Sequence, residues 1–159
     1  MVIAARRNPM RACGFTLIEL VVAMSVLAIL AALAAPAFRA FVAAARVREA
    51  GSDLLESALL ARSEAVKRAA NVDVIPTAGN WQNGWTVQVG ATVLESRPAT
   101  TGVTIAPNVA GNITFQLSGR VSTAIRTLTL STAQSTTVRC LAIDPSGRAS
   151  LKASSNGCS

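Results

Sequence analysis

Apolar residues form one long run near the start of the chain. From Leu20 to Phe38, nineteen residues carry no charge. Extended back to Phe15, the run would span about 36 Å as a helix, enough for the hydrocarbon core of a bilayer. One carboxylate, Glu19, lies close to its beginning, and a charge at bilayer depth costs about 2.5 kcal/mol or more. We therefore expect Glu19 to have a function.

Three interpretations of this run differ in what is removed from the chain. The first is a cleaved secretory signal peptide with a small-x-small cleavage site at Ala32-Leu33-Ala34. The second is a plain transmembrane anchor. In the third, a short basic leader is removed after Gly14 and the run stays, so that Phe15 gains an amine that can partner Glu19 in an apolar setting. The third is favoured, because a carboxylate suits neither a signal peptide core nor a simple anchor.

Helical periodicity continues beyond the apolar run. Apolar residues recur at helical spacing, and charged residues occupy much of the rest. The recurring positions are Val47, Leu54, Ala58, Ala61 and Ala65. This pattern predicts an amphipathic half-helix over 39–70 that continues the segment 15–38, in one helix about 84 Å long. Glu64 can pair with Arg68 at i,i+4, and Gly51 is a weak point without being a break.

Residues 71–159 have the pattern of a β-rich head. Short stretches alternate apolar and polar residues with a period of two, and Gly, Pro and Asp mark the turns between them. The expected strands are Val72–Ile75, Trp85–Val89, Thr92–Ser96 after a Gly90-Ala91 turn, Ile113–Leu117, Arg126–Leu130, Thr136–Ile143 and Gly147–Leu151. Asp144-Pro145-Ser146-Gly147 predicts a type I turn. The fold class is therefore α+β, with a long N-terminal helix packed on an antiparallel sheet.

The charge of the chain is +7, and its last forty residues are more one-sided. There, five cations face the single carboxylate of Asp144: Arg120, Arg126, Arg139, Arg148 and Lys152. A basic end of this kind can attract nucleic acid or an anionic surface. It is equally typical of a solvated face that aids solubility, and the residues alone leave both interpretations open.

Cysteine and histidine usage limits the chemistry. If the end of the chain is exported, Cys140 and Cys158 can form a disulfide; the alternative is two free thiols. A zinc site is not expected, because the chain has no histidine and its third cysteine, Cys13, precedes the apolar run. The chain also lacks tyrosine, a P-loop and a GxGxxG motif. We expect no enzyme activity and no cofactor.

The stretch Gly14-Phe15-Thr16-Leu17-Ile18-Glu19-Leu20 resembles the class III signal of type IV pilins and type II secretion pseudopilins. This resemblance implies that residues 1–14 are a leader, which prepilin peptidase removes after Gly14 before it N-methylates Phe15. It also implies that Glu19 is the assembly glutamate. Orientation rests on the same resemblance, with the leader in the cytoplasm and the C-terminal part outside.

The head resembles the GspH/FimT family of minor pilins and pseudopilins at three stretches. These are the W-x-x-G-W pattern at Trp81 to Trp85, Ile-x-Phe-x-x-x-Gly at 113–119, and the ending "VRCLAIDPSGRASLK". The resemblance implies a structural subunit that assembles with other pilins into a type IV pilus or a type II secretion pseudopilus. It would be a single-pass protein of the bacterial inner membrane with a periplasmic head. Of Trp81 and Trp85, one is expected in the core and the other half-exposed at a loop, where Trp81 could be a contact residue.

The resemblance also implies an alternative function, DNA binding during natural transformation. FimT-type members use a C-terminal G-R-x-R motif, and the matching stretch here is Gly147-Arg148-Ala149-Ser150. Ser150 stands in place of the second arginine, which weakens the match. Lys152 could serve the same face of a strand, because side chains alternate. With Arg120 and Arg139, these cations could make a few salt-sensitive phosphate contacts.

Overall fold

A computed structural model describes residues 15–122, 127–154 and 158 of the chain. Its one long helix, α1, runs from Leu17 to Arg68. The chain divides into two compact units, residues 1–37 and 38–159. Every buried side chain in the described part belongs to the second unit. The second unit therefore has its own core and is expected to fold by itself.

In the first unit, Thr16 explains where α1 begins. Its side-chain oxygen accepts a hydrogen bond from the Glu19 N–H at 3.3 Å, and its carbonyl accepts one from the Leu20 N–H at 3.2 Å. Thr16 is thus the N-cap of α1, and Glu19 is at the third helical position. A carboxylate there interacts favourably with the positive, N-terminal end of the helix dipole. Pro36 lies inside α1 without ending it. By length and composition alone, α1 is long and apolar enough to cross a membrane.

In the second unit, α1 ends at a left-handed residue. Ala69 has a φ of 49°, and the Ala70 N–H donates to the Ala65 carbonyl at 3.2 Å. This is the 6→1 bond of a Schellman motif. The predicted pair of Glu64 and Arg68 is confirmed, with a Nε–Oε2 distance of 2.7 Å. The positive charge of Arg68 also interacts favourably with the negative, C-terminal end of the helix dipole.

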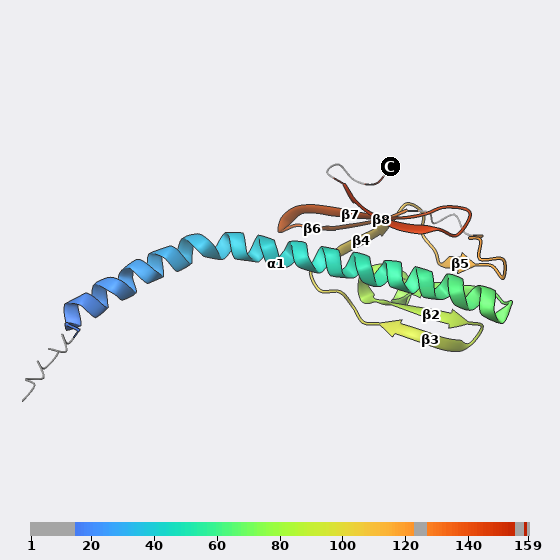
Figure 1. The fold of residues 1–159 in the computed structure, drawn as a ribbon, viewed down its shortest axis with the longest axis horizontal. Helices are drawn as coiled ribbons and strands as arrows, with labels where there is room; N and C mark the ends of the chain where they lie inside the picture. Colours follow the sequence, from blue (N-terminus) through green and yellow to red (C-terminus); the bar gives the residue numbers. More distant parts are fainter. Residues whose placement is uncertain (1–14, 123–126, 155–157, 159) are drawn as a thin grey trace, which may run out of the picture. The chain divides into compact units, whose positions relative to one another are not determined.

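Two antiparallel four-stranded sheets pack against α1 (Figure 1). The first has the order β3-β2-β1-β5, with bounds Thr92–Arg97, Trp85–Val89, Val72–Pro76 and Ile113–Phe115. The second has the order β4-β6-β7-β8, with bounds Thr104–Pro107, Thr127–Thr132, Ser135–Ile143 and Ala149–Ser154. Two short 3₁₀ turns, Thr77–Gly79 and Trp81–Asn83, join β1 to β2.

Small residues on α1 let the second sheet approach closely. The five residues of the predicted stripe are all buried, as are Ala43, Ala44 and Ala50. A Cβ on Gly51 would lie only 3.0 Å from Leu151 Cδ1 of β8. Gly51 is therefore a packing position, and the close approach explains why a helix-weakening residue is used there.

The second sheet has an inner and an outer face. Its inner face carries Leu128, Leu130, Leu141 and Ile143, which are buried in the core. The residues between them point the other way, because side chains alternate along a strand. The outer face therefore includes Cys140 and its register partner Lys152.

The α+β prediction is confirmed, but three details of the head differ. The strands form two sheets. β4 was not expected, because its four residues are too few to show a period. Leu117 lies outside β5 and is 59% exposed, because the chain turns directly after Phe115.

Candidate functional site

The predicted processing and assembly residues lie at the start of α1. Gly14 is outside the described residues, and the Phe15 side chain is 74% exposed. Glu19 is in the first turn and is exposed. One helical turn separates the two residues, about 6 Å along the axis. No ion pair among the described residues includes Glu19, so its carboxylate is available to a partner.

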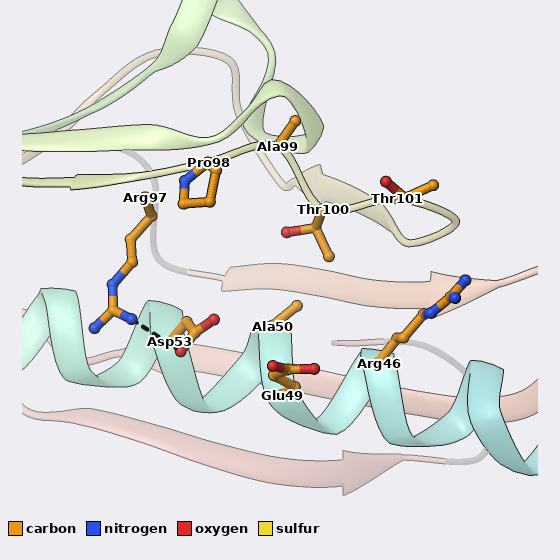
Figure 2. A pocket seen from close by; sticks show the side chains of 9 residues that line it. All are labelled: Arg46, Glu49, Ala50, Asp53, Arg97, Pro98, Ala99, Thr100 and Thr101. Carbon is orange, nitrogen blue, oxygen red and sulfur yellow. Dashed lines mark hydrogen bonds and ion pairs between the residues drawn. The ribbon is translucent and has the colours of Figure 1, made fainter.

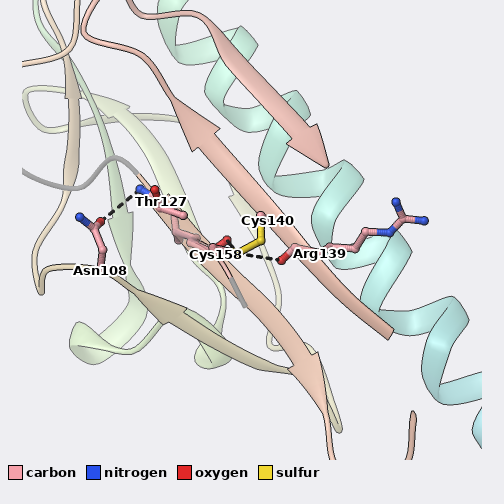
Figure 3. Close-up of a disulfide and its surroundings, with 6 residues drawn as sticks. Asn108, Thr127, Arg139, Cys140 and Cys158 are labelled. Atoms are coloured by element: carbon pink, nitrogen blue, oxygen red, sulfur yellow. Dashed lines mark hydrogen bonds between the residues drawn. A yellow bond between two sulfur atoms is a disulfide. The ribbon is translucent and has the colours of Figure 1, made fainter. Parts of the chain in front are cut away.

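The two predicted cysteines form a disulfide. Cys140 of β7 and Cys158 are bonded, with their Cα atoms 5.5 Å apart. Cys158 Sγ lies 3.8 Å from the carbonyl oxygen of Arg139 (Figure 3). The disulfide therefore fastens the end of the chain to the outer face of the second sheet.

Two predicted arginines follow turns of the same construction. In each, a glycine N–H donates at 2.7 Å to the carbonyl three residues earlier, from Gly119 to Gln116 and from Gly147 to Asp144. Both glycines have positive φ, 75° and 81°. The arginine that follows accepts a hydrogen bond through its carbonyl from the first residue of the turn, at 2.8 Å for Arg120 and 2.9 Å for Arg148. The turn expected at 144–147 is thus confirmed as a hydrogen-bonded turn.

These two turns are docked on each other. A Cβ on Gly147 would lie 1.8 Å from the Gly119 carbonyl oxygen and 3.5 Å from Arg120 Cα. The Val121 N–H donates to the Pro145 carbonyl at 3.3 Å. The fold therefore places the backbones of Arg120 and Arg148 side by side, and both residues are exposed. The signal in the sequence is the repeated tripeptide Ser-Gly-Arg at 118–120 and 146–148.

The other two predicted cations point to opposite faces of the second sheet. Lys152 is exposed on the outer face, beside a pocket of about 200 Å³ next to the disulfide. Arg139 lies on the inner face and reaches toward α1 (Figure 3), where its Cβ is 3.7 Å from the position of a Cβ on Gly51. The four predicted cations therefore do not form one continuous surface.

Both tryptophans belong to the core. Trp81 and Trp85 are 2% and 1% exposed, and their ring centroids are 6.4 Å apart. The expectation that Trp81 is a half-exposed contact residue is wrong, because its 3₁₀ turn directs the ring inward. Gly84 is the glycine of the W-x-x-G-W pattern. Its φ is 92°, and a Cβ there would lie 2.2 Å from the Arg97 carbonyl oxygen, so only glycine fits at this position.

A polar network joins α1 to the hairpin of β2 and β3. The Trp85 indole N–H donates to Ser57 Oγ at 2.9 Å, and Ser57 donates to Glu95 at 3.0 Å. Arg97 binds three carboxylates, with distances of 2.6 Å to Glu95, 2.8 Å to Glu56 and 3.3 Å to Asp53. These bonds satisfy the polar groups that the tryptophan and the hairpin bring to the helix.

Beside this network is an open pocket of about 320 Å³ (Figure 2). It is lined by Arg46, Glu49, Ala50, Asp53 and Arg97 to Thr101. Burial raises the pKa of Asp53; Arg97 opposes the rise, and the nearby carboxylates add to it. Within the described residues, no three His, Cys, Asp or Glu side chains are grouped to hold a metal ion.

Comparison with known protein families decides what this chain is. The profile described as "Type II transport protein GspH" matches residues 50–147. The chain belongs to this family. A second profile, "Prokaryotic N-terminal methylation motif", matches residues 9–35. GspH-family pilins and pseudopilins are structural subunits and not enzymes. The methylation motif and the apolar helix indicate anchoring in the inner membrane.

Solved structures support the pilin-like fold of this GspH-family chain. Two crystal structures of the type IV minor pilin FimU of Pseudomonas aeruginosa PAO1 are similar to it. The first is 23% identical in sequence and has a TM-score of 0.62; the similarity covers 70% of this chain and 92% of the FimU chain. The second is 25% identical and has a TM-score of 0.60; the similarity covers 70% of this chain and 96% of the FimU chain. No curated protein sequence matches the chain.

Proposed function

We propose that the chain is a minor pilin or pseudopilin whose leader is removed after Gly14 and whose apolar helix assembles with other pilins. The observation that carries this proposal is Glu19, a single carboxylate one turn from Phe15 in an otherwise uncharged segment. After cleavage, Phe15 would have a cationic amine, and in a filament the amine of a neighbouring subunit could neutralise Glu19 away from water. The head would then stand in the periplasm or on the filament surface.

Two filaments could contain this subunit. The GspH profile is described as a type II transport protein, whereas the two FimU structures are type IV minor pilins. Both assemblies would need the same processing and the same apolar helix. Purification of pili and of secretion pseudopili from the native bacterium would show which of them contains the chain.

The assembly step is tested with a charge-neutral variant. Glu19→Gln keeps the size of the side chain and removes its charge, and Ser25→Ala is a matched control in the same exposed segment. We expect Glu19→Gln to remain in the inner membrane and to disappear from sheared filaments, while Ser25→Ala enters them normally. Normal filament entry of Glu19→Gln would contradict the assembly role.

A second function, DNA binding by the head, is favoured by one observation. The docked Ser-Gly-Arg turns bring Arg120 and Arg148 together on the surface, although Ser150 interrupts the G-R-x-R pattern. Lys152 lies two residues beyond Ser150 on the same strand, about 13 Å from Arg148 along the chain. Contacts to phosphates from these cations would be independent of DNA sequence and sensitive to salt.

The DNA-binding function is tested by titrating residues 38–159 with duplex DNA over a salt series. We expect Arg148→Gln and Arg120→Gln each to weaken binding and to flatten the salt dependence. Absence of binding at low salt would leave the chain with its structural role alone.

A further inference from the structure

The position of Arg62 suggests a third arginine beside the docked turns. Arg62 is on α1 and lies against Gly119: a Cβ there would be 3.4 Å from Arg62 Nε and 3.7 Å from Arg62 Cγ. A Cβ on Gly119 would also meet Val66 Cγ2 at 3.1 Å. The first Ser-Gly-Arg turn is therefore held between α1 on one side and the second turn on the other. We propose that Arg62, Arg120 and Arg148 form one phosphate-binding surface for duplex DNA, which we name the three-arginine surface.

Charge supports this surface as a binding site. No carboxylate among the described residues lies within ion-pair distance of Arg62 or Arg120. Arg148 has only an exposed pair with Asp144 at 3.3 Å, which water and salt weaken. By contrast, Arg97 is bound by three carboxylates. The guanidinium groups of the three-arginine surface thus remain available to phosphates, which they bind with directed hydrogen bonds.

The aromatic residues indicate which form of DNA the surface takes. The chain has no tyrosine and six other aromatic residues, two Trp and four Phe. Trp81, Trp85 and Phe115 are buried. The remaining phenylalanines precede residue 42, so that Phe41, the nearest along α1, is about 31 Å of helix from Arg62. Bases of a single strand would find no stacking platform beside the surface.

Duplex DNA fits a surface that offers cations alone. Duplex DNA carries about one negative charge per 1.7 Å of its axis. A protein contact to one of its phosphates releases more condensed counterion than a contact to a phosphate of single-stranded DNA. We therefore expect duplex to bind more tightly than single strand. This inference rests on the proposed DNA-binding function and adds a helix residue that lies outside the C-terminal motif. Arg139, which faces α1, is not part of the surface.

The test is a titration of residues 38–159 with a fluorescent duplex of mixed sequence and with one of its strands at equal length. Arg62→Gln should weaken duplex binding several-fold and reduce the slope of log K against log salt by about one. Arg62→Lys should retain most of the affinity, because it keeps the charge. Arg48→Gln is the matched control, an exposed arginine about 21 Å away on the same helix. It should bind like the unmodified head.

Different outcomes overturn different parts of the proposal. If Arg62→Gln binds like Arg48→Gln while Arg120→Gln is weakened, the head binds DNA without α1 and the three-arginine surface is wrong. Single-strand binding as tight as duplex binding would refute the phosphate-only mode. If no DNA binds, the proposed DNA-binding function fails as well. The same variants can be tested for binding to phosphatidylglycerol vesicles. If they lose vesicle binding to the same extent and duplex DNA does not compete with the vesicles, the surface binds membranes and the DNA assignment is wrong. Unchanged urea unfolding of Arg62→Gln excludes misfolding as the cause.

Discussion

Replacement of Gly147 by alanine tests the docking of the two turns. The added Cβ would lie 1.8 Å from the Gly119 carbonyl oxygen, far inside van der Waals contact, and the obstructing atom is backbone. One turn must therefore move. Gly147 also has a φ of 81°, where a side chain is strained by about 1 kcal/mol or more. Overpacking adds about 1–3 kcal/mol.

Gly90→Ala is the matched control for this experiment. Gly90 is in the turn between β2 and β3 with a φ of 56°, and a Cβ there would meet nothing within 4 Å. Gly90→Ala therefore introduces the backbone strain of a side chain at positive φ without a steric clash. We expect Gly90→Ala to lower the free energy of unfolding of the head by about 1 kcal/mol and Gly147→Ala by about 2–4 kcal/mol.

The assay is urea unfolding of residues 38–159, followed by the fluorescence of the two buried tryptophans. The difference between the two variants measures the close approach of the turns. Equal losses of stability in both variants would show that the turns are not docked, and the three-arginine surface would lose its geometric basis. A changed m-value in only one variant would show that its denatured or native state had changed compactness.

Three further predictions concern the rest of the head. Reduction of the Cys140–Cys158 disulfide should lower the free energy of unfolding by about 3 kcal/mol, measured by urea unfolding with and without dithiothreitol; an unchanged midpoint would contradict this. Ser57→Ala leaves the buried Trp85 indole N–H without its acceptor and should cost about 1–3 kcal/mol in the same assay; a neutral result would show that the bond contributes nothing. Because the pKa of Asp53 is raised, the folded head holds that proton more tightly than the unfolded chain does. Stability should therefore fall as pH rises from the unfolded pKa of about 3.8 through the folded value, and Asp53→Asn should remove this part of the pH dependence. The same slope in that variant would contradict the assignment.

Local patterns predicted the helix and most of the strands. The stripe from Val47 to Ala65 has a strict helical period, and its burial follows from that period. The hairpin at Gly90-Ala91 is equally local, because a two-residue turn fixes the pairing of its strands. The disulfide between Cys140 and Cys158 follows from the oxidising compartment that is expected for an exported chain, and the structure contains it.

Features that depend on distant contacts were not predictable. β4 has too few residues to show a pattern and is defined by its pairing with β6. Trp81 is buried because its turn directs it into the core, which no neighbouring residue indicates. The docking of the Ser-Gly-Arg turns joins segments 28 residues apart, between 119 and 147, and depends on the absence of a Cβ atom at Gly147. Arg62 had no motif to mark it.

The mass of the mature protein tests the central claim most directly. Protein purified from the membranes of the native bacterium should begin at Phe15 and carry one methyl group on its amine. Because the claim is that the leader alone is removed, the apolar helix must still be present. A mass that begins at Ala35 or Pro36 would show an ordinary secretory signal peptide, and a mass that includes residues 1–14 would show a plain anchor. Either result would contradict the assignment of Glu19 to filament assembly.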